Sequence, residues 1–307
     1  MSLVVVGSLG IDTVETPGAR RESVLGGSSA YFSAAASFFG PVRLVAAVGE
    51  DFPREHRERL ASFQNIDLRG LETMRGARTF RWAGRYFARM NDRETLAVEL
   101  NVLEGWSPVV PPSYRDSRFL FLANAAPATQ LAILDHFPER PVVVADTMDF
   151  WIRHAREDLS RLLLVVDGLV VNDREAVELA GVENLVVAGK RLLARGLRFV
   201  VIKKGEHGSL LVHEDGVAAL PAFPSDRVVD PTGAGDSFAG GLMGFLASRA
   251  GPGRGALSFS ALLRAVAHAT VVASFTIEDF SLDRLARLSP AELASRFRAF
   301  QRMLRVE

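Results

Sequence analysis

The chain has 307 residues, and 48% of them are hydrophobic, which is enough for one large α/β domain or two smaller ones. Its 36 basic and 36 acidic side chains cancel, so bulk charge gives no reason to expect a nucleic-acid or membrane-surface partner. There is no cysteine, which excludes disulfides and thiolate metal sites.

The first predicted strand is the apolar run at residues 3–6, which ends at Gly7. The Gly-Ser-Leu-Gly sequence at this point does not match the GxGxxG of a dinucleotide-binding fold, and no helical pattern follows it. Asp12 comes soon after the strand, at the end where α/β sheets bind ligands. The pair Gly26-Gly27 then precedes a helix rich in small residues, which closes at Gly40.

Alternating apolar and polar residues between Thr79 and Leu100 predict a β-hairpin, with Asn91-Asp92-Arg93 as its turn. Elsewhere buried strands alternate with helical patterns, so this hairpin indicates a small inserted sheet. The alternation predicts an α/β fold with a doubly wound, mostly parallel sheet and helices on both faces. No Walker A sequence is present, which excludes a P-loop kinase.

Several polar residues follow predicted strands directly. Asn124 and Asp146 each come after a buried strand, and the carboxyl ends of such strands form the ligand edge of the sheet. Asn172 also follows a strand and is expected to cap the next helix, with Glu175 completing a capping box.

The most constrained stretch is Asp230 to Phe238, which reads DPTGAGDSF. The helical spacing of Phe238, Leu242 and Phe245 predicts a buried helix that begins here. Small residues let backbone amides approach a ligand closely, and a helix N-terminus attracts anions. Asp236 lies in the first turn, where the helix end is expected to favour its ionised form. A Gly-rich turn with a stabilising aspartate is the structural alternative to a phosphate site.

DPTGAGDSF resembles the C-terminal signature of the ribokinase-like (PfkB) carbohydrate and nucleoside kinases, and Gly26-Gly27 resembles their weaker N-terminal signature. The resemblance implies transfer of the γ-phosphoryl group of ATP to a primary alcohol of a sugar or sugar-like acceptor. It implies Asp236 as the base, with the amides of Gly233, Ala234 and Gly235 stabilising the developing charge. The alternatives are a nucleoside acceptor and a non-catalytic, nucleotide-binding regulator with the same fold.

The resemblance also assigns the binding residues. It implies that the acceptor is held by Asp12, Gly26, Gly27 and Asn124. It implies that the nucleotide lies against Asn172, Lys203, Gly205, Gly208, Thr232 and His268. The Gly-Gly-Ser-Ser-Ala sequence departs from the ribokinase-type Gly-Gly-Lys-Gly-Ala-Asn form, which argues against ribose as the acceptor.

Further expectations concern the metal ions, the domain organisation and the cellular location of the protein. Mg²⁺ is expected to be held through water by Glu175, and a monovalent cation such as K⁺ by Asp230 and the loop at 276–281. One kinase domain is expected over residues 1–307, with lid segments at about 13–25 and 77–104 that pair with a second copy in some relatives. No run of about 20 apolar residues and no signal peptide are seen, so a cytoplasmic protein is expected.

Overall fold

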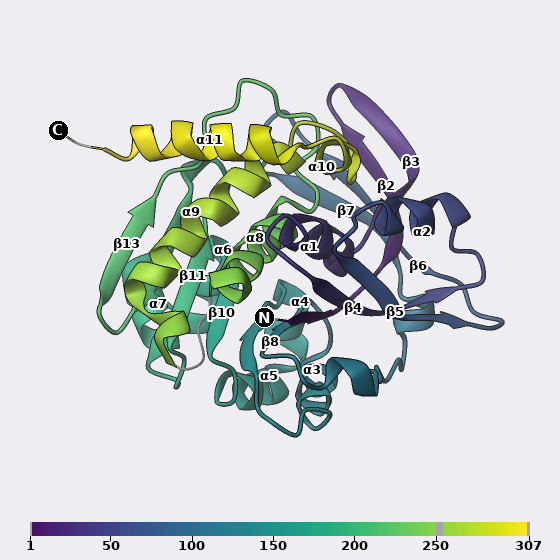
Figure 1. Cartoon of the computed structure of the whole chain (residues 1–307), viewed down its shortest axis with the longest axis horizontal. Helices are drawn as coiled ribbons and strands as arrows, with labels where there is room; N and C mark the ends of the chain where they lie inside the picture. The colour runs from purple at the N-terminus through teal and green to yellow at the C-terminus, as the bar shows by residue number, and fades with distance from the viewer. Residues whose placement is uncertain (1, 250–253, 306–307) are drawn as a thin grey trace.

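A computed structural model describes residues 2–249 and 254–305, and within them a nine-stranded sheet runs in the order β13-β12-β11-β10-β9-β8-β1-β4-β5 (Figure 1). Its strands are β1 (Leu3–Val6), β4 (Val42–Gly49), β5 (Ile66–Met74), β8 (Phe119–Leu122), β9 (Val142–Ala145), β10 (Gly168–Asn172), β11 (Phe199–Lys203), β12 (Ser209–His213) and β13 (Gly216–Leu220). The strands from β5 to β11 are parallel, whereas β12 and β13 pair antiparallel. The predicted mostly parallel sheet is therefore confirmed.

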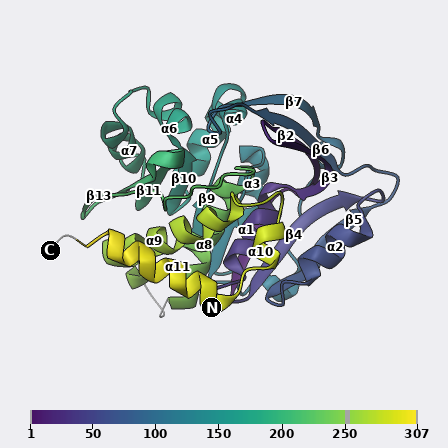
Figure 2. The same cartoon turned by 90° about the horizontal axis from the view of Figure 1, so that it is seen from above.

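Helices cover both faces of this sheet, as Figure 2 shows. One face carries α1 (Ser28–Ala36), α2 (Arg54–Ala61), α8 (Ala234–Arg249), α9 (Phe259–Thr276), α10 (Asp283–Ala286) and α11 (Pro290–Met303). The other carries α3 (Pro127–Leu134), α4 (Asp149–His154), α5 (Arg156–Leu163), α6 (Asp173–Ala180) and α7 (Leu185–Leu193). Short 3₁₀ turns lie at η1 (Asn101–Leu103), η2 (Pro112–Tyr114), η3 (Gly205–His207) and η4 (Arg254–Leu257).

Strand β1 shows why its sequence is almost entirely apolar. Leu3 and Val5 belong to the core under α1, α8 and α9, while Val4 and Val6 belong to the core under the opposite helices. Successive side chains of a strand point to opposite faces, so a strand covered on both sides needs apolar residues at every position.

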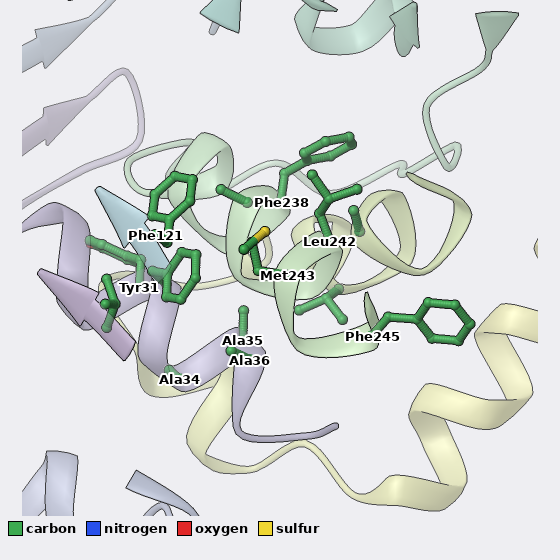
Figure 3. Packing of buried hydrophobic residues seen from close by; sticks show 14 of the residues in the cluster. Tyr31, Ala34, Ala35, Ala36, Phe121, Phe238, Leu242, Met243 and Phe245 are labelled. Carbon is green, nitrogen blue, oxygen red and sulfur yellow. The ribbon is translucent and has the colours of Figure 1, made fainter. Parts of the chain in front are cut away.

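Helices α1 and α8 pack closely because both are rich in small residues (Figure 3). A Cβ at Gly240 would lie 2.2 Å from the carbonyl oxygen of Phe32, and one at Gly244 would lie 2.9 Å from the Cα of Ala36. Phe32 in turn stacks on Phe121 of β8 with ring centroids 4.4 Å apart. The close approach fixes the start of α8 beside the start of α1.

Helix α9 packs along α8, where a Cβ at Gly241 would lie 2.9 Å from the Cα of Ala269. By length and composition alone, α9 is the one helix in the described residues that could cross a membrane. Of its span, 61% is buried inside the fold. Its apolar composition is accordingly that of a helix in the protein core.

A second sheet, named here the lid, has the strand order β3-β2-β6-β7. It consists of β2 (Gly10–Thr16), β3 (Ala19–Gly26), β6 (Phe80–Tyr86) and β7 (Arg93–Glu99). β6 and β7 form the predicted hairpin, and β2 pairs parallel with β6. Val14 and Tyr86 of the lid pack on Phe280, which follows α9, so the lid rests on the C-terminal part of the chain.

Candidate active site

The segment from Asp230 to Phe238 is named here the motif. Its first residues, Asp230 to Ala234, form a tight turn that leads into α8. The backbone amide of Thr232 donates to Oδ1 of Asp230 at 2.8 Å, and the amide of Ala234 donates to the carbonyl of Pro231 at 3.1 Å. The first amides of a helix have no intrahelical acceptor, which makes the start of α8 a place for an anion. The amide of Ala234 is engaged in the turn, so Gly233 and Gly235 are the better placed of the three predicted donors.

Gly233 is required at its position for two reasons. Its φ is +73°, and a Cβ there would lie 2.2 Å from ring atoms of Tyr31. The Tyr31 ring therefore lies directly against the glycine backbone of the motif. Its hydroxyl has no hydrogen-bond partner among the described residues, and burial, followed by the charges of Asp230 and Asp12, raises its pKa well above the usual range.

Asp236 lies in the first turn of α8 and is half-buried. Burial raises its pKa to about 6, against the opposing positive charges of Lys203 and Arg93. The start of α8 was expected to favour the ionised form, and burial opposes that effect strongly enough to raise the pKa. A carboxylate with a pKa closer to neutrality is a stronger base than an exposed aspartate.

Lys203, the last residue of β11, lies beside the glycines of the motif. Its Nζ would be 2.9 Å from a Cβ at Gly235. Asp146, just after β9, is buried, and its Oδ1 has no partner among the described residues. Burial, followed by the charge of Asp236, raises the pKa of Asp146 well above its usual range, while Lys203 opposes the shift.

Asn172 and Glu175 form the predicted capping box at the start of α6. The Glu175 amide donates to Oδ1 of Asn172, and the Asn172 amide donates to Oε2 of Glu175, both at 2.8 Å. Burial raises the pKa of Glu175, and the charge of Lys203 opposes it. Asn172 therefore acts here as a helix cap. The positive charge of Lys203 acts on Glu175 as it does on Asp146 and Asp236.

The carboxylates of this cluster can be compared with the needs of a metal ion. In residues 2–249 and 254–305, no group of three or more histidine or acidic side chains is arranged to enclose a metal. Mg²⁺ in phosphate-transfer sites uses one or two carboxylates, with phosphate oxygens and water as its other ligands. The unpartnered oxygen of Asp146 and the neighbouring Glu175 fit that requirement.

Asp12 on β2 faces the motif from the lid side. A Cβ at Gly26 would lie 1.9 Å from its Oδ2, so only glycine fits beneath the carboxyl group. Its Oδ1 is buried, with no partner among the residues that the structure describes. Burial, followed by the charges of Asp230 and Asp236, raises the pKa of Asp12 to about 8. Asp12 and Asp236 are thus brought to one site from opposite ends of the sequence.

The second glycine of the pair allows α1 to start against the β1–β2 connection. Gly27 has φ +94°, and a Cβ there would lie 2.5 Å from the carbonyl oxygen of Ser8. The Oγ of Ser8 accepts from the Ser28 amide at 3.1 Å, and the Ser29 hydroxyl donates to the Ser8 carbonyl at 2.6 Å. Gly27 is the N-cap of α1, and Ser8 accepts hydrogen bonds from the first turn of the helix, a role that sequence reasoning missed.

Asn124 and Thr232, which were predicted to contact ligands, form side-chain contacts with other residues of the protein. Oδ1 of Asn124 accepts from the indole N–H of Trp151 at 3.0 Å, and its Nδ2 lies 3.1 Å from Sδ of Met148. The hydroxyl of Thr232 donates to the phenol oxygen of Tyr86 at 3.2 Å. Asn124 and Thr232 are therefore tied to α4 and to the lid, respectively.

His268 lies in an aromatic stack, which differs from the nucleotide contact expected of it. Its ring is stacked between those of Phe245 and Phe297, with centroid distances of 4.2 and 3.7 Å. Burial, followed by the charge of Arg249, lowers its pKa to about 4. Both ring faces are covered, so no face is free to stack on an adenine base.

Gly205 and Gly208 form the predicted turn after β11, with φ values of +54° and +83°. The tip of the lid hairpin reaches this turn, because a Cβ at Gly205 would lie 2.4 Å from Oδ1 of Asn91. Next to it, Arg174 of α6 forms an ion pair of 3.0 Å with Asp92. The lid thus spans the site from Asp12 to the turn expected to hold the nucleotide.

Asp230 connects the motif to the loop after α9. It is buried, its Oδ2 has no partner within the described part of the chain, and burial raises its pKa to about 6 despite opposing bonds from Thr232. Ser281 has φ +54°, and its hydroxyl donates to the carbonyl of Leu25 at 2.5 Å. A cation at Asp230 stays a prediction.

Comparisons with known proteins place the chain among kinases. The family model described as pfkB family carbohydrate kinase matches residues 121–284. A cytidine kinase of Thermococcus kodakarensis is 31% identical over 253 residues, which cover 79% of this chain and 87% of that protein. A nucleoside kinase of Methanothermobacter thermautotrophicus is 28% identical over 280 residues, covering 85% and 80% of the two chains.

Solved structures show the same fold. A Burkholderia thailandensis nucleoside kinase in complex with inosine has 18% identity and a TM-score of 0.80, with 97% of this chain and 98% of that chain covered. A putative ribokinase II from E. coli in complex with ATP and Mg²⁺ has 19% identity and a TM-score of 0.77, with 97% and 99% covered. At these identities the likeness establishes the fold alone.

Proposed function

Because the chain belongs to the pfkB family of carbohydrate kinases, we propose that it transfers the γ-phosphoryl group of ATP to the primary alcohol of a nucleoside. The observation that carries the nucleoside assignment is the 31% identity to a cytidine kinase over 79% of this chain. A free sugar is the second candidate, since the family as described is one of carbohydrate kinases.

In the proposed reaction Asp236 orients the acceptor hydroxyl and receives its proton. The bond between the γ-phosphorus and the ADP oxygen breaks as the bond between phosphorus and the acceptor oxygen forms. An alcohol is a much weaker acid than a carboxylic acid, so the proton moves to Asp236 only as bonding to phosphorus develops. A pKa of about 6 leaves this carboxyl mainly ionised at neutral pH.

The charge of the transferred group is stabilised from two sides. The amides of Gly233 and Gly235 at the start of α8 face it, and Lys203 lies beside them. Mg²⁺, when bound with ATP, neutralises phosphate charge, and Glu175 and Asp146 are the carboxylates that would hold its water ligands. The two amides and Lys203 are held in place by the fold, so these donors need no rearrangement during the reaction.

The acceptor is held beneath the lid by Asp12 of strand β2. The orphaned Oδ1 of Asp12 accepts hydroxyl groups of the acceptor, and Gly26 leaves room for the carboxyl beneath them. Two acceptor hydroxyls that donate to Asp12 favour its ionised form, and the resulting charge-assisted hydrogen bonds are stronger than neutral ones. A sugar ring satisfies this pattern whether or not it carries a base.

An acceptor panel tests the proposal. ADP release is measured with cytidine, uridine, adenosine, inosine, ribose and fructose, and with a 5′-deoxynucleoside as the matched non-acceptor. We expect turnover with a nucleoside, a product phosphorylated at its primary alcohol, and none with the 5′-deoxy analogue. Turnover with free sugars alone assigns the second candidate. ATP binding without turnover on any acceptor supports the non-catalytic alternative. Loss of activity in EDTA and its return with Mg²⁺ tests the metal requirement.

We also propose that the outer edge of the lid pairs with a second copy. Strand β7 lies at the edge of the small sheet, where its Leu96 and Val98 are 46% and 52% exposed, and Leu100 directly after it is 46% exposed. An exposed apolar edge strand is a template for pairing. Light scattering should give twice the mass of the chain, and Val98→Lys should give the monomer. A monomeric wild type would contradict the pairing.

A further inference from the structure

Arg93 is the first residue of β7 and lies directly opposite Tyr86 of β6 in the lid. Tyr86 is buried against the motif through Thr232, so Arg93 begins β7 at the part of the lid nearest the motif. Arg85, one position earlier on β6, has the opposite orientation and pairs with Glu15 at 2.8 Å. The two arginines therefore lie close together on the lid, but their side chains are on opposite faces of the small sheet.

The guanidinium of Arg93 rests on an aromatic surface. It lies 5.6 Å from the ring centroid of Trp82, within the range of a cation–π contact. The Trp82 ring in turn lies over Gly84, where a Cβ would be 2.1 Å from its Cη2. Glycine at 84 thus lets the indole lie over the strand and form a platform for the guanidinium.

Arg93 has no carboxylate partner within 4.0 Å among the described residues, yet its charge acts on Asp236 of α8. Burial raises the pKa of Asp236, and the charges of Lys203 and Arg93 oppose that effect. Lys203 belongs to the main sheet and Arg93 to the lid, so the two cations approach Asp236 from different parts of the fold.

We propose that Arg93 is the cation that the lid contributes to phosphoryl transfer, contacting oxygens of the phosphoryl group as it passes from ATP to the acceptor. This inference rests on the proposed function. The guanidinium makes and breaks no covalent bond: phosphorus leaves the ADP oxygen for the acceptor oxygen, and the proton goes to Asp236. Arg93 from the lid and Lys203 from the main sheet then both neutralise the transferred group, and the planar guanidinium suits phosphate oxygens.

The position of Arg93 on the lid has a functional consequence. Its charge reaches the reacting group only when the β6–β7 hairpin lies across the site, as Asn91 over Gly205 and Asp92 with Arg174 hold it here. An open lid would remove a stabilising cation from bound ATP. Transfer to water in the absence of acceptor would then be slow.

The test compares Arg93→Ala with Arg85→Ala, which removes the same charge from the same hairpin on its other side. With the acceptor that the wild type uses, kcat of Arg93→Ala should fall by about 10²-fold or more, as for loss of a transition-state donor. KM for acceptor and ATP should stay within about threefold. Arg93→Lys should recover part of the rate, and added guanidinium ion should partly rescue Arg93→Ala but not Arg85→Ala.

Circular dichroism and a melt establish that each variant is folded. If the wild type turns over and folded Arg93→Ala keeps kcat within about threefold of Arg85→Ala, the inference about Arg93 is wrong while the proposed function stands. If the wild type phosphorylates no acceptor, the proposed function fails, and the role of Arg93 fails with it.

Discussion

The hydroxyl of Thr232 donates a hydrogen bond of 3.2 Å to the phenol oxygen of Tyr86. One residue belongs to the turn before α8 and the other to strand β6 of the lid, and both are buried. The lid is thereby connected to the segment that would hold the transferred phosphate. Movement of the lid and the arrangement of the phosphate site are expected to depend on each other through this bond.

Replacing Tyr86 by Phe tests that connection. The hydroxyl of Thr232 loses its acceptor, so the lid should close less firmly and acceptor KM should rise several-fold, with faster amide exchange in β6 and β7. Tyr114→Phe is the matched control, because it removes a similar bond to the carbonyl of Asp67 far from the lid. Equal acceptor KM in the two variants would show that the Thr232–Tyr86 bond does not control the lid.

Replacing Asp12 by Asn should weaken acceptor binding and stabilise the fold. The pKa of Asp12 is raised to about 8 from 3.8, so the folded state favours the neutral acid. Its contribution to stability is therefore fully present below about pH 4 and is lost as pH rises towards 8. Asn does not ionise, so at this position it causes no such loss of stability as pH rises.

Melts of wild type and Asp12→Asn at pH 5 and pH 8 measure this effect. The variant should melt higher than the wild type, by more at pH 8 than at pH 5, while its acceptor KM rises far more than its ATP KM. A difference in melting temperature that does not change with pH would mean that Asp12 titrates as an ordinary exposed carboxyl.

Gly233→Ala should destabilise the protein more than its backbone conformation alone explains. A left-handed φ costs a non-glycine residue about 1–2 kcal/mol. At Gly233 the added Cβ also meets the Tyr31 ring at 2.2 Å, whereas at Gly181, with φ +65°, it meets nothing within 4 Å. Urea unfolding should therefore show a larger loss for Gly233→Ala than for Gly181→Ala. Similar losses would mean that Tyr31 moves aside without cost.

Much of the fold could be predicted from the sequence, because buried parallel strands are nearly continuous apolar runs. β8 (Phe119–Leu122) and β9 (Val142–Ala145) end just before Asn124 and Asp146, where buried strands were predicted. Strand β5 was not predicted: it lies at the sheet edge, and its sequence from Ile66 to Met74 mixes apolar residues with exposed polar ones. Such a strand lacks both the continuous run and a clear alternation.

The site was only partly predictable, because its contacts join distant segments. Asp12, Gly26 and the DPTGAGD turn could be singled out from local residue types, and the structure brings them together. Tyr31 looks like any apolar residue of a buried helix, and only its contact with Gly233 gives it a role. His268 was assigned from its position on a helix, but Phe245 and Phe297 from other helices cover its ring.

The most direct test of the account is kcat of Asp236→Asn, measured at saturating ATP and acceptor in a variant shown to be folded by circular dichroism. Asn keeps the size of the side chain and one acceptor oxygen but cannot receive the proton. The control is Asp283→Asn, which changes another first-turn aspartate, on α10. We predict that kcat falls by about 10²-fold or more for Asp236→Asn, with ATP affinity unchanged or tighter and Asp283→Asn unaffected. A folded Asp236→Asn variant that turns over within about threefold of the wild type would contradict general-base catalysis by Asp236.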